Sequence, residues 1–447
     1  MSRRTQADNY RWRVGGLLAV GMFVGYLDRV NLSVAAGPLS QSLHLSPSQL
    51  GVILSAYLWT YAVLQLPVGS LIDRIGIRWI MRISTILWTL ASFLTAFAGG
   101  LGTLMLYRLI LGIGETPVFP ASWKATTVWF PYTERSTSTG LLNAASRLSS
   151  FLGLPAMAFV VSLYGWQAAF ILTGFLSLLY TVAFWAIYRS PADAMRAGRL
   201  TEEEHAYIVD GGAHVELPAS GAKRISLRYL LRRRKVWGLT LGYGFVAYVT
   251  YLLLSWLPVY LQESLGVSVL SSGLYSAIPW GVAALAEFFI AGRLADYLVK
   301  RAADPTRTRR GFLVFSGLAT SAVIGAIVSH SVPVVVVFLS VGMAGLVVNI
   351  TTGVSIIGLV APSGSEGTLG GLVNAAANLI GLASPIVTGF VVQTTGSFIP
   401  AFIIAGVFMA LGLFCYLVVL GRIEQIPRPA SETDQSPGDT PVRATAH

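Results

Sequence analysis

The residues best able to do chemistry in this chain are a few charged side chains set inside apolar segments. Asp28 and Arg29 interrupt an apolar run from Val14 to Leu39. That run is about 25 residues long, and a helix needs roughly 20 to cross a bilayer. Charges at membrane depth are costly and normally face a bundle interior or a water-filled path. We therefore interpret the pair as functional; a structural ion pair between helices is the alternative.

Four further charges lie deep in apolar segments. The whole set is Asp28, Arg29, Arg108, Glu115, Arg147 and Glu287. Arg108 and Glu115 are seven residues apart, which places them on one helix face, about 10 Å apart along the axis. Asp28 and Arg29 are neighbours and point about 100° apart, so they cannot pair well with each other. The simplest assignment pairs Asp28 with Arg108 and leaves Arg29 free for an anion.

These charges could couple proton binding to transport. Burial favours the neutral form of a carboxyl group, and a nearby arginine favours its charged form. If that arginine moved, the proton affinity would change, as a proton-coupled carrier requires. A static lock between Arg108 and Glu115 is the alternative. Glu287 lies nearer the end of its segment, and we interpret it as structural.

Polar and aromatic side chains recur at helical spacing in other apolar segments. The candidates are Tyr57, Tyr61 and Gln65, each four residues after the last, then Tyr251, and Asn374 with Asn378. Phenol and amide groups that face a cavity suit a hydroxylated substrate, and Tyr61 is the first choice. Packing and hydrogen bonding between helices are the alternative interpretation of all of them.

The composition is that of a membrane protein. Hydrophobic residues make up 54% and charged residues 11% of the 447, whereas soluble domains have about 25% charged residues. We predict an all-α protein with twelve transmembrane helices at 14–38, 48–72, 79–99, 101–125, 137–162, 167–188, 237–261, 270–295, 311–330, 333–360, 367–392 and 398–420. The first run is too long, and too charged, for a cleaved signal peptide.

Lysine and arginine set the predicted orientation. The loops after segments 1, 3, 5, 7, 9 and 11 contain neither residue, whereas those after segments 2, 4, 6 and 8 carry Arg74, Arg78, Arg135, the basic cluster at 232–235 and the basic run at 300–310. Both termini are therefore predicted to be cytoplasmic. The net charge of +11 is then a topology signal, and no nucleic-acid partner is expected. We divide the chain into a tail (1–13), a bundle (14–188), a cytoplasmic linker (189–236), a second bundle (237–420) and a disordered tail (421–447).

Two pairs of similar stretches indicate an internal repeat. Residues 69–73 resemble 292–296, and residues 140–145 resemble 371–376. Two parallel six-helix repeats with a substrate site between them build one known transporter fold. At the first pair and in the turn that follows residue 73, we predict a conformational latch made of Gly69, Asp73, Arg74, Arg78 and Asp296. The sequence has no phosphate loop, zinc-ligand spacing or nucleophile elbow, so we predict no enzyme, metal or cofactor.

Several motifs carry a resemblance to a known family. The pattern Gly-x-Leu-x-Asp-Arg-x-Gly at 69–76, with twelve segments and a central linker, resembles the major facilitator superfamily. The stretches 26–36, 107–121 and 129–135 resemble its anion:cation symporter family, which includes bacterial hexuronate, galactonate and glucarate transporters. The resemblance implies two six-helix bundles and proton-coupled uptake of an organic anion by alternating access, driven by the proton gradient.

The resemblance also implies roles for single residues. Asp28 and Glu115 match the acids that carry protons in this family, and Arg108 matches the arginine that senses their charge. Arg29 matches the arginine that binds the substrate carboxylate. Tyr61 and Asn374 match positions that contact hydroxyl groups, and Tyr57, Tyr251 and Asn378 complete the predicted site. Two departures are Ile77, where a basic residue is usual, and Arg147, where sugar-acid members have a small or neutral one.

The predicted substrate is a carboxylate, and a sugar acid such as a hexuronate, hexonate or aldarate is favoured. Arg147 could meet a second carboxylate, so a dicarboxylate such as phthalate or tartrate is the alternative. Pairing of Arg147 with a local acid, or its extension toward an interface, would remove that argument. A drug exporter of the same fold and a transport-dead sensor are weaker alternatives. We expect a monomer in a bacterial inner membrane, surrounded by lipids.

Overall fold

The structure is a computed structural model that describes residues 9–213, 226–301, 304–362 and 365–427. Those ranges are helical throughout apart from turns and short connections, and they contain no strand. Nine of their helices are long and apolar enough to cross a membrane, or ten if the bent pair Pro47–Gln65 and Pro67–Ile75 is one span. Helices suit a bilayer because they pair their own backbone groups.

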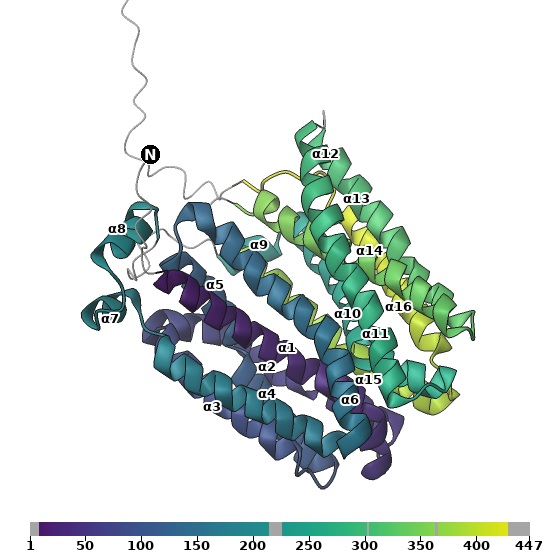
Figure 1. The fold of residues 1–447 in the computed structure, drawn as a ribbon. Helices are drawn as coiled ribbons and strands as arrows, with labels where there is room; N and C mark the ends of the chain where they lie inside the picture. The colour runs from purple at the N-terminus through teal and green to yellow at the C-terminus, as the bar shows by residue number, and fades with distance from the viewer. Residues whose placement is uncertain (1–8, 214–225, 302–303, 363–364, 428–447) are drawn as a thin grey trace, which may run out of the picture.

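The first half of the chain supplies six helices that lie together (Figure 1). They are α1 (Tyr10–Ser42), α2 (Pro47–Ile75), α3 (Ile77–Thr95), α4 (Leu101–Glu115), α5 (Val118–Trp129) and α6 (Tyr132–Ile187). The predicted segment 101–125 is divided into α4 and α5 at Thr116 and Pro117. The predicted segments 137–162 and 167–188 both fall within α6, which is interrupted at Gly165 (φ 82°). These two differences explain why the helix count is below the predicted twelve.

The second half forms another group of helices. They are α10 (Arg234–Leu265), α11 (Val269–Ala286), α12 (Ala295–Arg301), α13 (Pro305–Thr320), α14 (Val332–Val360), α15 (Glu366–Thr395) and α16 (Ile399–Phe414). A π-helical segment, η1 (Glu287–Leu294), joins α11 to α12. A 3₁₀-helix, η2 (Ser321–Ile327), follows α13, and a short π-helix, η3 (Cys415–Val419), follows α16. The predicted segment 270–295 therefore ends in non-α geometry, which often occurs at functional positions.

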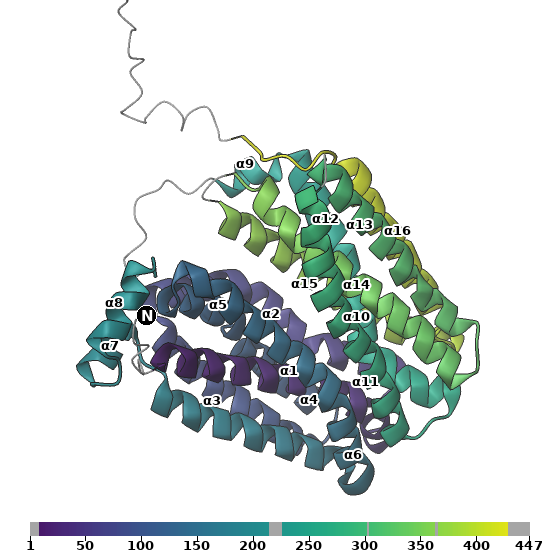
Figure 2. The same ribbon diagram turned by 45° about the horizontal axis from the view of Figure 1, so that its top comes forward.

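The two groups of helices meet along α2 with α15 and α6 with α11 (Figures 1 and 2). Glycines allow the backbones to touch there. A Cβ added to Gly51 would lie 2.4 Å from the carbonyl oxygen of Pro385, and one added to Gly389 would lie 2.4 Å from that of Pro47. Real Cβ atoms do not approach so closely, so larger residues at either position would separate α2 from α15.

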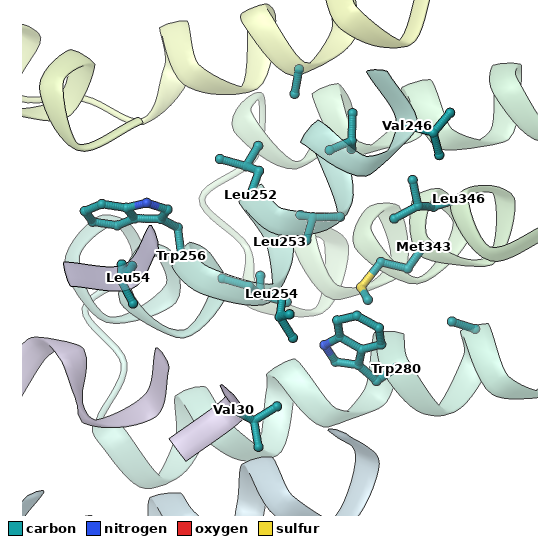
Figure 3. Packing of buried hydrophobic residues seen from close by; sticks show 14 of the residues in the cluster. Val30, Leu54, Val246, Leu252, Leu253, Leu254, Trp256, Trp280, Met343 and Leu346 are labelled. Atoms are coloured by element: carbon teal, nitrogen blue, oxygen red, sulfur yellow. The ribbon is translucent and has the colours of Figure 1, made fainter. Parts of the chain in front are cut away.

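An apolar core continues across this interface. Figure 3 shows Leu54 of α2 near Trp256 of α10, and Trp280 of α11 between Met343 of α14 and Val30 of α1. Each of these side chains is at most 4% exposed. The bundles are therefore held together at this level by burial of apolar surface.

The segment between the bundles contains three short helices, α7 (Pro191–Arg196), α8 (Glu202–Asp210) and α9 (Leu227–Leu231). Glu204 of α8 is buried against the start of α1. It accepts hydrogen bonds from the backbone N–H groups of Tyr10 and Arg11 at 3.2 Å each, and from Nη1 of Arg11 at 3.0 Å. The first part of the predicted linker thus packs on the first bundle. Residues 214–225, and most of the predicted disordered tail (428–447), lie outside the described residues.

Candidate functional site

The centre of the site is an ion pair between Arg29 of α1 and Glu115, the last residue of α4. Nε of Arg29 lies 3.0 Å from Oε2 of Glu115, and the two side chains are 9% and 2% exposed. The prediction that Arg29 is free for an anion is therefore corrected, because an internal carboxylate already faces it. The sequence placed Glu115 seven residues from Arg108 but did not reveal which arginine it would meet across two helices.

Small residues bring Glu115 to this position. A Cβ added to Gly112 would lie 2.2 Å from the carbonyl oxygen of Tyr57 on α2, and one added to Gly114 would lie 2.7 Å from the backbone nitrogen of Trp88 on α3. The last turn of α4 therefore touches both neighbouring helices. Helix α4 ends at Glu115. Its last turn is held between α2 and α3, and the Glu115 side chain extends from it toward α1.

Three tyrosines surround the guanidinium of Arg29. Its Cζ lies 4.8 Å from the ring centroid of Tyr26, 5.3 Å from that of Tyr57 and 5.1 Å from that of Tyr61. Aromatic faces attract a cation, and more strongly where water is excluded. Tyr57 and Tyr61 are 6% and 4% exposed, and Tyr251 of α10 packs against them from the second bundle. The predicted tyrosines therefore gather at Arg29, at the boundary between the bundles.

Asp28 points away from Arg29, as the helical geometry predicts. It is 1% exposed and accepts hydrogen bonds from the indole N–H of Trp88 and from the hydroxyl of Ser177 on α6. No salt bridge joins Asp28 to Arg108 in the described part of the chain, so the predicted direct pair is also corrected. Neutral donors hold this carboxyl group, and neither of them was predicted, because a tryptophan and a serine in apolar segments resemble ordinary packing residues.

Arg108 is buried without a bonded counter-ion among the described residues. It is 1% exposed, its Nε and Nη2 atoms have no hydrogen-bond partner, and its Cζ lies 5.3 Å from the ring centroid of Phe170. Asp28 and Glu115 are both near enough to act on its charge. The static lock between Arg108 and Glu115 is therefore not formed, because Glu115 bonds to Arg29 instead.

Several buried polar atoms at this site lack a partner. Within the described residues they include the Tyr57 hydroxyl, Nε and Nη2 of Arg108, and Oε1 of Glu115. Buried polar atoms are bonded in the large majority of cases, and exceptions cluster where function requires them. The four charges Asp28, Arg29, Arg108 and Glu115 sum to zero when all are ionised. The site can therefore accept a proton and an anion together without a net change of buried charge.

Neutral hydrogen-bonding groups from the second bundle face the same region. The hydroxyl of Tyr251 donates to Oδ1 of Asn378 at 2.8 Å, and Nδ2 of Asn378 donates to Oε1 of Gln65 at 3.0 Å. This chain of bonds links α10, α15 and α2, so Asn378 joins the two bundles. Asn374 lies one turn earlier on α15 and is half-buried, on the face that the four-residue spacing predicts.

Arg147 forms a second ion pair, and its partner comes from the other bundle. Nε of Arg147 on α6 lies 2.8 Å from Oε2 of Glu287, the first residue of η1, and the side chains are 21% and 24% exposed. Thr351 of α14 also donates to Glu287, at 3.2 Å. The sequence interpretation left open a pairing of Arg147 with an acid, and the acid is Glu287, 140 residues away in the chain.

The predicted latch residues lie at helix ends. Gly69, Asp73 and Arg74 are in the last turns of α2, Arg78 is in the first turn of α3, and Asp296 is in α12. Asp73 pairs with Lys124 of α5 at 2.9 Å, and Arg78 pairs with Asp193 of α7 at 2.9 Å. Lys124 was not predicted as a partner. The side chain of Asp296 lies outside the described residues, so the symmetry of the latch stays a prediction.

The described residues contain no group of three or more histidine, cysteine, aspartate or glutamate side chains that could hold a metal ion. The buried carboxyl and guanidinium groups of the site are suited to the exchange of protons and of ion-pair partners.

Comparison with known proteins places this geometry in context. Residues 18–303 match the family described as the Major Facilitator Superfamily. A protein of Bacillus subtilis (strain 168) named "Uncharacterized transporter YybO" is 35% identical over 93% of this chain and 95% of its own length. A "Probable L-galactonate transporter" of Escherichia coli (strain K12) is 32% identical over 92% and 90%. The "Probable galactarate/D-glucarate transporter GarP" of the same strain is 30% identical over 90% and 93%.

A solved structure shares the fold. It is the crystal structure of a bacterial homolog to the human lysosomal transporter Spinster, in an inward-facing and occupied conformation. It has a TM-score of 0.73 and 18% identity, and the match covers 92% of this chain and 97% of that one. This similarity concerns the arrangement of helices alone. The predicted fold class is confirmed at that level, as an all-helical membrane protein.

Proposed function

Because the chain belongs to the Major Facilitator Superfamily, we propose that it is a proton-coupled symporter that takes up an organic carboxylate, with a sugar acid favoured, by alternating access. Relatives that are 30–32% identical to this chain are named as probable transporters of galactarate and D-glucarate, of L-galactonate and of sulfoacetate. The observation that carries the proposal is the buried Arg29–Glu115 pair, surrounded by tyrosines from both bundles.

In this mechanism, Glu115 and the substrate compete for Arg29. While Glu115 is ionised, it occupies the guanidinium. A proton that binds Glu115 removes its negative charge and weakens the pair, so that a substrate carboxylate can take its place. The charge of the proton and that of the carboxylate bound at Arg29 then cancel, and these buried charges again sum to zero. Coupling follows because a carboxylate that entered without a proton would leave an uncompensated negative charge in a low-dielectric site.

Asp28 and Arg108 supply a second protonation step in the proposal. Arg108 lies within electrostatic reach of both acids and is bonded to neither. When Glu115 becomes neutral, Asp28 is the remaining negative charge near Arg108. Movement of Arg108 toward Asp28 would then report the state of Glu115 to α3 and α6. The hydroxyl and amide groups of Tyr57, Tyr61, Asn374 and Asn378 complete the site by bonding substrate hydroxyls.

The proposed setting is a bacterial inner membrane that the chain crosses twelve times as a monomer, with both termini in the cytoplasm. The proposal of twelve counts α4 with α5 as one span, α6 as two and the bent α2 as one; by length and apolar composition alone the described residues give nine spans, or ten with α2. The ends of α2 and α3 that carry Asp73 and Arg78 would form the cytoplasmic latch. Reporter fusions at either terminus test the orientation, and a periplasmic signal would refute it.

Uptake into proteoliposomes tests the function. An inward proton gradient should concentrate a sugar acid, and each inward proton gains about 2.3 kcal/mol per 100 mV of membrane potential. Arg29→Ala should weaken substrate binding by about tenfold or more, because it removes a charged hydrogen bond worth about 1.5–3 kcal/mol. Thermal-shift screening of sugar acids and aromatic acids would supply the ligand. If no pH gradient drives any of these acids inward, the proposal fails.

A dicarboxylate such as phthalate or tartrate is the alternative substrate; because Arg147 is already paired with Glu287, a second carboxylate would bind there only by displacing that acid. A drug exporter would need a broad apolar cavity, whereas this interface contains buried arginines; efflux of a cationic dye would support that function instead. A transport-dead sensor has no supporting observation in the described residues.

A further inference from the structure

Arg147 and Glu287 form the one ion pair between the two bundles in the described part of the chain. The guanidinium comes from α6 in the first half, and the carboxylate comes from η1 in the second. Both side chains keep about a fifth of their surface exposed. This pair differs from Arg29–Glu115, which lies wholly within the first bundle and is more deeply buried.

The helices that carry the two arginines pack on each other. The hydroxyl of Ser149 on α6, two residues after Arg147, donates to the carbonyl oxygen of Phe23 on α1 at 2.7 Å. Glu287 reaches Arg147 from the second bundle. Two guanidinium groups, each paired with one internal carboxylate, therefore lie on neighbouring helices of the first bundle.

Arg147 has bonding capacity beyond this pair. The hydrogen bond to Glu287 uses Nε, and within the described residues no other bond involves the guanidinium. A guanidinium can form two parallel bonds to a carboxylate through its planar fork. Glu287 also accepts a hydrogen bond from the hydroxyl of Thr351 and its side chain is 24% exposed, so its release from Arg147 would not leave the carboxylate without a partner.

We propose that Arg147 and Glu287 form a second anion subsite, in which a carboxylate at the far end of the substrate displaces Glu287 from Arg147. The proposal rests on the carboxylate transport proposed above and specifies its substrate class as a dianion. A monoanion would leave the Arg147–Glu287 bond intact. A dianion would break the one ion pair between the bundles, so that occupancy of both ends releases the bundles to move.

Binding of galactarate and D-galactonate to the purified protein tests this proposal, because the two sugar acids differ only in the carboxylate or hydroxymethyl group at one end. In Arg147→Gln, galactarate should bind about tenfold more weakly or worse, as expected for loss of about 1.4 kcal/mol or more, while galactonate changes less than about twofold. Glu287→Gln should strengthen galactarate binding, because it removes the internal competitor. Lys235→Gln, which removes a peripheral positive charge of the second bundle, should change neither ligand.

The possible outcomes are distinct. Equal weakening of both ligands in Arg147→Gln, or no change in either, would make the pair a structural tie and overturn the subsite. Wild-type protein that binds galactonate but not galactarate would also overturn it while supporting the proposed function. Wild-type protein that binds neither acid would overturn the subsite for sugar dianions, whereas the proposed function fails only if no acid of the wider panel is driven inward. The double variant Arg147→Gln/Glu287→Gln, which replaces the ion pair by two amides, controls for folding and should retain galactonate binding.

Discussion

Replacement of Glu115 by glutamine is the most informative single change in this protein. The variant keeps the size of the side chain and removes the charge that faces Arg29 at 3.0 Å. Both groups are buried, so the arginine would be left uncompensated; removal of one partner from a buried pair costs about 3–5 kcal/mol. The set formed by Asp28, Arg29, Arg108 and residue 115 would then carry a net charge of +1.

A substrate carboxylate would restore the balance in this variant. We therefore expect the substrate to raise the melting temperature of Glu115→Gln by more than that of the wild type. Concentrative uptake driven by a pH gradient should be lost, because no proton is exchanged at position 115. Exchange of labelled for unlabelled substrate across the same proteoliposome membrane should continue, because Arg29 can still bind the anion.

Two measurements could refute this reasoning. If Glu115→Gln concentrates substrate as well as the wild type does, the role of Glu115 in proton coupling is rejected. A ligand-induced thermal shift no larger than that of the wild type would reject competition between Glu115 and substrate for Arg29. Glu202→Gln, at an exposed acid of α8, is the matched control and should behave as the wild type in both assays.

Three further changes test the supporting structure. Trp88→Phe removes the indole donor to Asp28 and should lower the free energy of unfolding by about 1.5–3 kcal/mol, the contribution of a hydrogen bond to a charged group; an unchanged denaturation midpoint would contradict it. Glu204→Gln should lower the free energy of unfolding by about 1.5–3 kcal/mol, because it weakens charged hydrogen bonds to Arg11 while Arg11 keeps its pair with Glu134; thermal unfolding measures this. Gly51→Ala should separate α2 from α15 and reduce uptake, whereas Gly140→Ala, where an added Cβ meets nothing within 4 Å, should not; equal uptake by both would show that the helices adjust.

The helices could be predicted from the sequence because the cause is local. A run of apolar side chains must become a helix in a bilayer, and each observed membrane helix overlaps a predicted segment. Breaks within helices were less visible. Pro117 coincides with the end of α4, whereas Pro155 lies inside α6 without ending it. A proline in the sequence therefore does not show by itself where a helix ends.

The residues of the site were predictable, but their pairing was not. Helical spacing shows which face of one helix carries a residue, as it does for Asp28 and Arg29. It does not show how two helices are rotated and shifted against each other, which depends on contacts such as those at Gly112 and Gly114. For that reason the spacing of residues did not predict that Glu115 forms its ion pair with Arg29 and not with Arg108. The partner of Arg147 lay in the other half of the chain, beyond the reach of any spacing rule.

The contacts of Glu204 have a consequence for how the chain can be divided. A buried carboxylate that bonds the start of α1 makes α8 part of the first half, although the hydrophobic segments of that half end before it. Two separately expressed polypeptides should therefore reassemble only if the first retains α8. A break introduced between positions 214 and 225 would keep Glu204 on the same fragment as α1. A break at position 189 would place Glu204 on the second fragment, so the N–H groups of Tyr10 and Arg11 in the first fragment would lack their acceptor.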